Sequence, residues 1–222
     1  MRTTIVLSAG LLAALGGAAH CTAATLEVSV VDEHGKPVEH VAVYATSNSA
    51  RQSAAASVES RPKAIMDQQR NQFVPHMLVV RAGTEVTFPN SDDVSHHVYS
   101  FSPAKPFELP LYKGDVYPPV VFDQPGIVVV GCNIHDSMLG YIRVVDTPHF
   151  AVTNEQGVAL LDGMPNGDYA VEAWTPRVRA ADLPTAQHVA VANGSVSAEI
   201  RITGRLAPAH SHGSGSLTWD RY

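Results

Sequence analysis

Residues 126–138 read Gly-Ile-Val-Val-Val-Gly-Cys-Asn-Ile-His-Asp-Ser-Met, and this stretch decides the fold. Its opening is a short apolar run bounded by glycines, which is typical of a buried β-strand. The loop that follows presents a thiol, an imidazole and a thioether, at Cys132, His135 and Met138. Sulfur and nitrogen donors at three-residue spacings, directly after a strand, indicate a metal site supported by a β framework.

Similar short apolar segments recur on both sides of this stretch. They lie at residues 26–31, 41–44, 77–80, 86–88, 120–122, 141–145, 150–153, 158–161, 169–174, 188–191 and 197–202. Gly, Pro, Asn or Asp residues separate most of them, and helical periodicity is nearly absent. The pattern therefore predicts an all-β protein made of sandwiches or barrels.

The overall composition restricts the class of protein further. The chain has 222 residues, of which 45% are hydrophobic and 16% charged, so it has enough apolar material for a globular core. Lys and Arg number 15 against 21 Asp and Glu, which gives no electrostatic case for binding nucleic acid. Two cysteines can form neither a disulfide-dense scaffold nor, unaided, a four-thiolate metal site.

Residues 1–24 have the features of a signal peptide. Arg2 precedes an apolar, glycine-broken run, and small residues suit cleavage before Thr25. Cys21 follows His20, where a lipid-attachment signal requires a small residue, so we expect no lipid anchor. The mature protein should be periplasmic or secreted, with no membrane span. Cys132 is then a lone thiol in an oxidising compartment, where it is buried, paired between chains or bound to a metal.

A second group of donors lies upstream, in the segment 90–98, Asn-Ser-Asp-Asp-Val-Ser-His-His-Val. We expect its imidazoles at the end of another strand. Two His, one Cys and a weak axial Met are the ligands of blue-copper centres, so the predicted cofactor is copper, Cu(I) or Cu(II). Zinc is a poorer match, because thioether is not among its usual ligands. Taken singly, the three loop residues have ordinary structural roles: a small buried Cys, a surface His and a Met that fills a core gap.

Residues 63–148 resemble a cupredoxin domain of the plastocyanin and amicyanin kind. The resemblance rests on Phe88-Pro-Asn90, His96-His97-Val98, Pro125-Gly126 and the Cys-x-x-His-x-x-Met loop. It implies a Greek-key β-sandwich and a type 1 copper site with ligands His96, Cys132, His135 and Met138, with His97 as the alternative to His96. It also implies that the Asn90 side chain joins the two ligand loops by hydrogen bonds. A wider resemblance is to methylamine-utilisation-type proteins. Asp136 departs from the amicyanin pattern, which has proline at that place.

The flanking segments resemble a carboxypeptidase regulatory-like sandwich. Its two halves match Asp32-Glu-His-Gly-Lys-Pro-Val38 and the stretch from Thr153 to Tyr169. We therefore expect a second, smaller Ig-like or prealbumin-like sandwich, made of residues 25–62 and 149–204, with the cupredoxin inserted between them. The alternative is that residues 25–62 add strands to the cupredoxin. Residues 205–222 are rich in small residues and are predicted to be a disordered tail.

These features predict an exported copper protein that carries single electrons between transient redox partner proteins and is not an enzyme. The sequence leaves the oligomeric state open. Copper storage, delivery or sensing is the alternative, with scattered histidines such as His34, His40, His210 and His212 as possible helpers. A third possibility is an interaction module that no longer uses its copper site. No second histidine cluster of the kind that copper oxidases need is evident.

Overall fold

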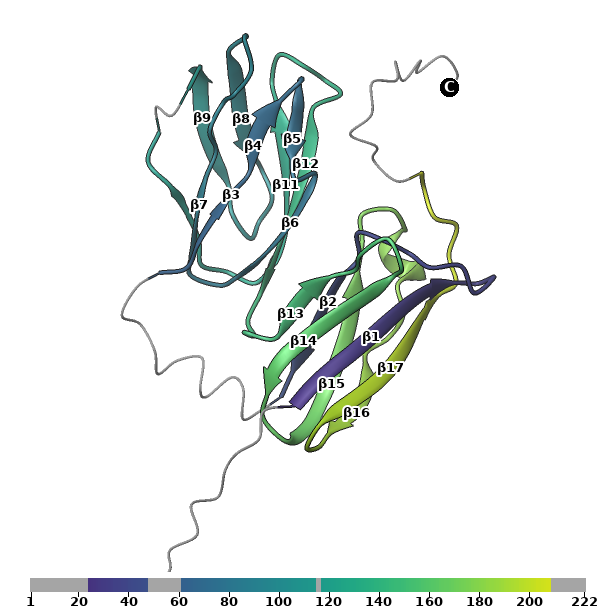
Figure 1. The fold of residues 1–222 in the computed structure, drawn as a ribbon. Coiled ribbons are helices and arrows are strands. Elements are labelled where there is room, and N and C mark those ends of the chain that lie inside the picture. The colour runs from purple at the N-terminus through teal and green to yellow at the C-terminus, as the bar shows by residue number, and fades with distance from the viewer. Residues whose placement is uncertain (1–23, 48–60, 115–116, 209–222) are drawn as a thin grey trace, which may run out of the picture.

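The computed structural model describes residues 24–47, 61–114 and 117–208 (Figure 1). The predicted signal peptide, apart from Ala24, and residues 209–222 of the predicted tail lie outside the described residues. Within the described ranges the chain is built of β-strands and one 3₁₀ turn, η1 (Ala180–Asp182), which confirms the predicted all-β class. In these ranges no helix is long and apolar enough to cross a membrane.

One sandwich, here called the terminal sandwich, is built from both ends of the described chain (Figure 1). One of its sheets has the order β14 (Val158–Met164), β1 (Ala24–Asp32) and β17 (Ser195–Ile202). The other has the order β13 (Phe150–Val152), β2 (Ala42–Thr46), β15 (Gly167–Trp174) and β16 (Gln187–Val191). Strands from before and after the central region are therefore hydrogen-bonded neighbours in both sheets.

The alternation in β1 explains how this sandwich forms its core. Leu26, Val28 and Val30 are fully buried, and they pack with residues of both sheets. Gly157 permits the turn before β14 to approach β1 closely, because a Cβ at this position would lie 2.6 Å from the carbonyl oxygen of Val30. Its φ of +71° also favours glycine.

The central sandwich comprises residues 63–145. Its larger sheet has the order β6 (Met77–Arg81), β12 (Leu139–Val145), β11 (Gly126–Cys132), β8 (His96–Ser100) and β9 (Phe107–Tyr112). Its smaller sheet has the order β10 (Val120–Phe122), β7 (Thr84–Thr87) and β3 (Lys63–Ile65), and the hairpin of β4 (Asp67–Gln69) and β5 (Gln72–Val74) lies beside them. An apolar core that includes Phe73, Phe122 and Ile142 fills the space between the sheets.

The strand that bears the upstream histidines differs from the sequence expectation. The histidines, expected at the end of a strand, lie at its beginning: His96 is the first residue of β8, β7 stops at Thr87, and residues 88–95 form the connection. The sequence also gave no sign of β9, because Pro110 interrupts its pattern. β9 is the last strand of its sheet, where a proline is tolerated.

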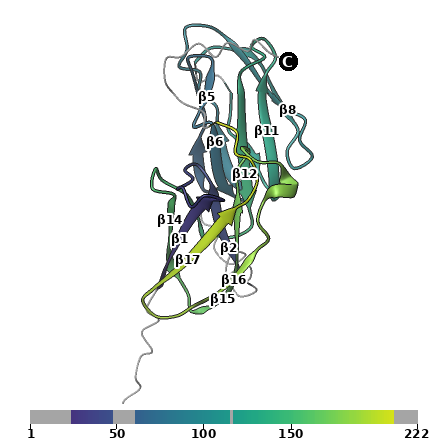
Figure 2. The ribbon, with the colours of Figure 1, turned by 90° about the vertical axis from the view of Figure 1, so that its right-hand side faces the viewer.

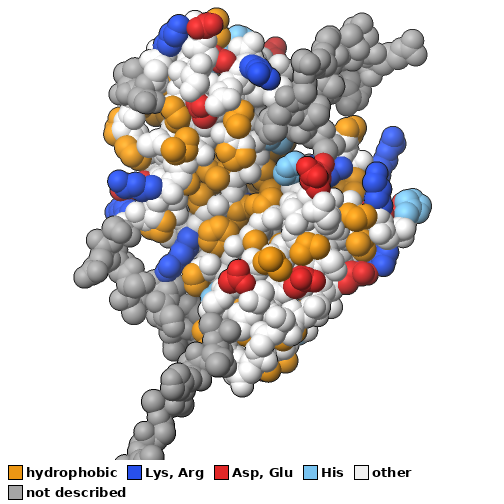
Figure 3. Space-filling model, in the orientation of Figure 1, with side chains coloured by type: hydrophobic (Ala, Val, Ile, Leu, Met, Phe, Trp, Pro, Cys, Tyr) orange, Lys and Arg blue, Asp and Glu red, His pale blue; other side chains and the backbone are white. Residues whose placement is uncertain are grey.

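The two sandwiches meet along a third apolar cluster, here called the interface cluster. Figure 2 shows them from the side, and Figure 3 shows hydrophobic side chains gathered along the middle of one face. The cluster combines buried residues of β2 and β15 with buried residues of β6 and β12: Ala42, Tyr44, Trp174, Met77, Val79 and Val145. The β6 and β12 end of the larger central sheet therefore packs on the terminal sandwich.

Ordered contacts continue beyond residue 204, where we placed the start of the tail. Leu206 packs against the core of the terminal sandwich. The backbone N–H of Ala207 donates to the carbonyl of Arg177 at 2.8 Å, and the Ala207 carbonyl accepts from Arg177 Nε at 2.8 Å. Pairing with the Arg177 segment therefore extends the folded part of the chain to this point.

Candidate metal centre

Neighbouring strands and one loop bring three of the predicted ligands together. Cys132 is the last residue of β11 and pairs with Val98 of β8. His96 begins β8, and its side chain is fully buried, while Cys132 is 4% exposed. His135 lies in the loop that joins β11 to β12 and is half-buried. The pairing of β8 with β11 thus aligns donors that are 36 residues apart in sequence.

The donor atoms lie close enough for one ion to contact all three. Nδ1 of His96 is 3.1 Å from Nδ1 of His135, and each of these nitrogens is 3.7 Å from Cys132 Sγ. Metal bonds of about 2.0 Å to nitrogen and about 2.3 Å to sulfur are compatible with such spacings. In the described part of the chain, this is the one group of three or more His, Cys, Asp or Glu side chains arranged to hold a metal ion. We call it the donor group.

Met138 lies at the end of the same loop and is 1% exposed, in the same apolar cluster as Cys132. The loop is closed by backbone hydrogen bonds: the Met138 N–H donates to His135 at 2.8 Å, and the Cys132 N–H donates to Met138 at 3.2 Å. The Asn133 N–H donates to the carbonyl of His97, at 3.2 Å, which joins the loop to β8. The short loop therefore holds Met138 in the buried apolar cluster that also contains Cys132.

His97 lies outside the donor group. Because side chains alternate along a strand, His96 faces the core of the central sandwich and His97 the opposite side of the sheet. His97 Nε2 is 2.9 Å from Glu108 Oε1, and its ring packs edge-on to Tyr99. Of the two adjacent histidines, His96 alone is positioned with Cys132 and His135.

Asn90 stabilises the connection before β8, but differently from what we expected. Its Nδ2 donates to the carbonyls of Val94 at 2.9 Å and Tyr112 at 2.8 Å, and its Oδ1 accepts from the Asp92 N–H at 3.0 Å. These bonds tie residues 90–94 to the end of β9. Among the described residues, the side chain of Asn90 makes no hydrogen bond to the Cys132 loop, and the backbone bond from Asn133 to His97 joins that loop to β8 instead.

Asp92 is the residue of the site that sequence reasoning missed. Its Oδ2 lies 2.8 Å from Nε2 of His96, on the opposite side of the ring from the donor group. The carboxylate also accepts hydrogen bonds from the backbone N–H groups of Arg70 and Asn71. Burial acts to raise the pKa of Asp92, but the hydrogen bonds from Asn71, His96 and Arg70 outweigh it and lower that pKa. Asp92 precedes His96 by four residues, a spacing too common to have identified it.

Exposed aliphatic side chains occur in the loop and in the segments next to it. Val94 is 47% exposed, Ile134 52% and Leu139 37%. In sequence, Ile134 adjoins His135, Leu139 adjoins Met138, and Val94 lies two residues before His96. Asp136, beside His135, is exposed. In sequence, the half-buried His135 thus lies between an exposed aliphatic residue, Ile134, and an exposed carboxylate, Asp136.

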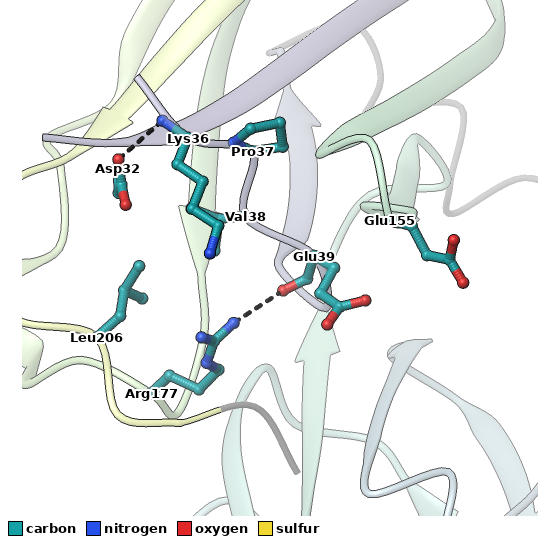
Figure 4. A pocket seen from close by; sticks show the side chains of 8 residues that line it. All are labelled: Asp32, Lys36, Pro37, Val38, Glu39, Glu155, Arg177 and Leu206. Atoms are coloured by element: carbon teal, nitrogen blue, oxygen red, sulfur yellow. Dashed lines mark hydrogen bonds between the residues drawn. The ribbon is translucent and has the colours of Figure 1, made fainter. Parts of the chain in front are cut away.

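A cavity of about 560 Å³ lies away from this centre (Figure 4). It lies on the terminal sandwich and its lining includes Lys36, Glu155 and Arg177. Two hydrogen bonds join its lining residues: the Lys36 N–H donates to the Asp32 carboxylate, and Arg177 Nη1 donates to the carbonyl of Glu39. None of the donor group lines it.

Comparisons with known proteins return partial structural likenesses. No family model and no curated protein matches the chain. A purple cupredoxin from Nitrosopumilus maritimus matches 38% of this chain and 99% of its own, with 23% identity and a TM-score of 0.33. A reduced Cu(I) form of amicyanin matches 41% of this chain and 89% of its own, with 21% identity and a TM-score of 0.34.

A copper-containing nitrite reductase from Thermus scotoductus also matches. The likeness covers 52% of this chain but 28% of the reductase, with 24% identity and a TM-score of 0.37. The chain thus spans under a third of that enzyme. By its own geometry, the protein is a two-sandwich β protein with a His–Cys–His group that can hold a metal ion.

Proposed function

We propose that the protein is an exported type 1 copper protein that carries single electrons between redox partners. The single observation that supports this most strongly is the donor group, in which one thiol and two imidazoles converge within 4.8 Å. A His₂Cys set with a long axial thioether is typical of blue-copper electron-transfer sites. When bound, copper would supply the redox couple, by alternating between Cu(II) and Cu(I).

The residues of the site fit that ion by their chemistry. Thiolate and thioether are soft donors that suit Cu(I), and imidazole suits copper in general. We infer that Met138 would supply the thioether ligand, because its side chain is buried in the cluster that also contains Cys132. The donors lie between paired strands and a hydrogen-bonded loop, so their positions should change little when the charge of the ion changes.

His135 offers the route by which electrons enter and leave. It is the half-buried member of the donor group, whereas His96 and Cys132 are buried. The exposed aliphatic side chains of Ile134, next to it in sequence, and of Val94 and Leu139 suit a small and weak contact, as in transient electron-transfer complexes. The proposed partners are therefore redox proteins that dock over the loop between β11 and β12.

We further propose that residues 25–62 and 149–204 form a regulatory-like sandwich into which residues 63–148 are inserted. The pairing of β1 with β14 and β17, and of β2 with β13 and β15, supports this division. The interface cluster then gives the terminal sandwich a role, which is to hold the copper-binding sandwich in place.

Copper retention during redox cycling distinguishes an electron carrier from a protein that stores or delivers copper. The copper-loaded protein is reduced and re-oxidised repeatedly in the presence of a Cu(I) chelator, and bound copper is measured after each cycle. A carrier should retain its copper, since the buried donors hold both oxidation states. Transfer of the copper to the chelator in the first reduction would favour storage or delivery.

A further inference from the structure

The side of His96 that faces away from the donor group is bound by a carboxylate. His96 Nδ1 points to His135 and Cys132, and its Nε2 lies 2.8 Å from Asp92 Oδ2. A carboxylate accepts hydrogen bonds and does not donate them when ionised, so Nε2 must hold the proton. The lone pair of the neutral ring is then on Nδ1, where a metal would need it.

Asp92 is itself held by the turn of the β4–β5 hairpin. Arg70 and Asn71 have φ angles of +55° and +56°, the left-handed conformation that a tight hairpin turn requires. In this conformation the backbone N–H groups of both residues donate to the Asp92 carboxylate. The Asp92 side chain is 13% exposed. A turn more than twenty residues earlier in the chain therefore fixes the carboxylate that binds His96.

We propose that Asp92 is a positioning residue that fixes His96 in the Nε2–H tautomer and lowers the reduction potential of the copper site. The inference rests on the proposed function, since it concerns the potential of that copper. Partners of this kind orient ligating histidines and raise their basicity. A negative charge next to the ligand also favours Cu(II) over the less charged Cu(I), and burial limits its screening by solvent.

Asp93 provides a matched control for the charge alone. It is the next residue in the chain, its side chain is fully exposed, and its nearest described cation is Lys113 at 4.0 Å. It makes no described contact with the donor group. Asp92→Asn and Asp93→Asn therefore remove the same charge within one residue of each other. Only Asp92→Asn removes the charge that is bonded to His96.

The test measures the reduction potential and copper affinity of the wild type and both variants after copper loading. Asn retains an acceptor oxygen and the size of the side chain, so Asp92→Asn should keep the fold and the colour. We expect it to raise the potential clearly more than Asp93→Asn does, and to weaken copper binding about 10-fold to 100-fold. Equal shifts in the two variants would overturn the inference.

A second measurement needs no metal. Nitrogen NMR of the metal-free wild type, at a pH where the imidazoles are neutral, reports which nitrogen of His96 holds the proton. We expect the Nε2–H tautomer, and an Nδ1–H tautomer would overturn the inference even if the copper protein is blue. A colourless copper complex, with His96 held as Nε2–H, would instead contradict the proposed function and leave the positioning role of Asp92 supported.

Discussion

At the scale of single residues, the proposed function depends on Cys132. It is the free cysteine of the described chain and is buried at the end of β11. Its Sγ lies at equal distances from two imidazole nitrogens. A buried thiol of this kind can be a small apolar filler, but two convergent imidazoles are not needed for that role. The geometry therefore favours a ligand over a filler.

Replacing this thiol should abolish the colour and preserve the fold. In Cys132→Ser the sulfur that gives the thiolate-to-copper absorption is gone, while the side chain keeps a similar size. We expect the visible band of the copper-loaded protein to disappear and the far-ultraviolet circular dichroism to stay that of β-sheet. Ser137→Ala, in the same loop but exposed, is the control and should keep the band.

Replacing the thioether of Met138 should change the reduction potential of the bound copper without preventing copper binding. Met138→Gln exchanges the soft thioether for a harder amide oxygen on a side chain of similar length, and an oxygen ligand would favour Cu(II). We expect copper to remain bound and the reduction potential to fall, as measured by redox titration. An unchanged potential would mean that Met138 is a core residue and not a ligand.

At the scale of elements, β12 follows the loop that contains His135 and Met138, and it pairs with both β11 and β6. Gly140 pairs with Val130 of β11, and a Cβ on it would lie 2.9 Å from Cβ of the buried Phe73. The absence of a side chain thus lets the aromatic ring pack directly against the strand that follows the loop. Packing of β5 on β12 therefore stabilises the base of the site.

Adding one methyl group at this position tests that packing. Gly140→Ala should lower the free energy of unfolding by about 1–3 kcal/mol, the usual cost of overpacking a core. Denaturant unfolding of the metal-free protein measures it. Gly167→Ala is the control, because its Cβ would be in ordinary contact, 3.8 Å from the ring of Tyr169. Similar losses in the two variants would contradict the explanation.

The loop between β11 and β12 is also the element that should meet partners. Electron self-exchange between copies of the protein needs no identified partner and uses the same surface. Ile134→Lys places a charge beside His135 and should slow self-exchange, measured by NMR line broadening in mixtures of Cu(I) and Cu(II) protein. Leu160→Lys is the control, because it adds the same charge at a residue of similar exposure, 51% against 52% for Ile134. Leu160 lies in β14 of the terminal sandwich, away from the loop. If both variants slowed self-exchange equally, the loop between β11 and β12 would not be the contact surface.

The sequence predicted those strands that contain a continuous or alternating run of apolar residues. The apolar runs at residues 127–130 and 141–145 lie in strands β11 and β12, where alternate side chains are buried in the core. Most strands of the larger sheet could be predicted from such runs. β9 was missed because Glu108 and Pro110 break its pattern, and an edge strand tolerates both. The contact of Asp92 with His96 depends on where the hairpin turn at Arg70 and Asn71 folds, which no local pattern reveals.

At the scale of the whole molecule, the two sandwiches are joined by polar as well as apolar contacts. The Tyr44 hydroxyl of the terminal sandwich accepts a hydrogen bond from Arg143 of β12 and donates to Glu172 at 3.1 Å. The Arg143 guanidinium also lies over the Tyr44 ring, 4.9 Å from its centroid. With the interface cluster, these contacts connect the terminal sandwich to the strand paired with β11.

The interface should weaken at alkaline pH. Burial, opposed by the Arg143 guanidinium but assisted by Glu172, raises the pKa of Tyr44 from 10.0 to about 12. An unfolded tyrosine loses its proton near pH 10, so this contribution to stability is complete below pH 10 and is lost as the pH rises to about 12.

Tyr44→Phe should therefore make the free energy of unfolding fall less steeply between about pH 10 and about pH 12 than in the wild type. Chemical unfolding at several pH values in this range measures the slope. Burial also raises the pKa values of Tyr141 and Tyr169, so part of the decline should persist in the variant. An identical slope in the two proteins would contradict the role assigned to Tyr44.

The visible spectrum of the mature protein, with copper content measured on the same sample, tests the central claim most directly. We predict one copper per chain and an intense thiolate-to-copper band that disappears on reduction and returns on re-oxidation, with the copper content unchanged. A protein that binds copper but remains colourless when oxidised would contradict the account, because Cys132 would then not be a ligand of the ion.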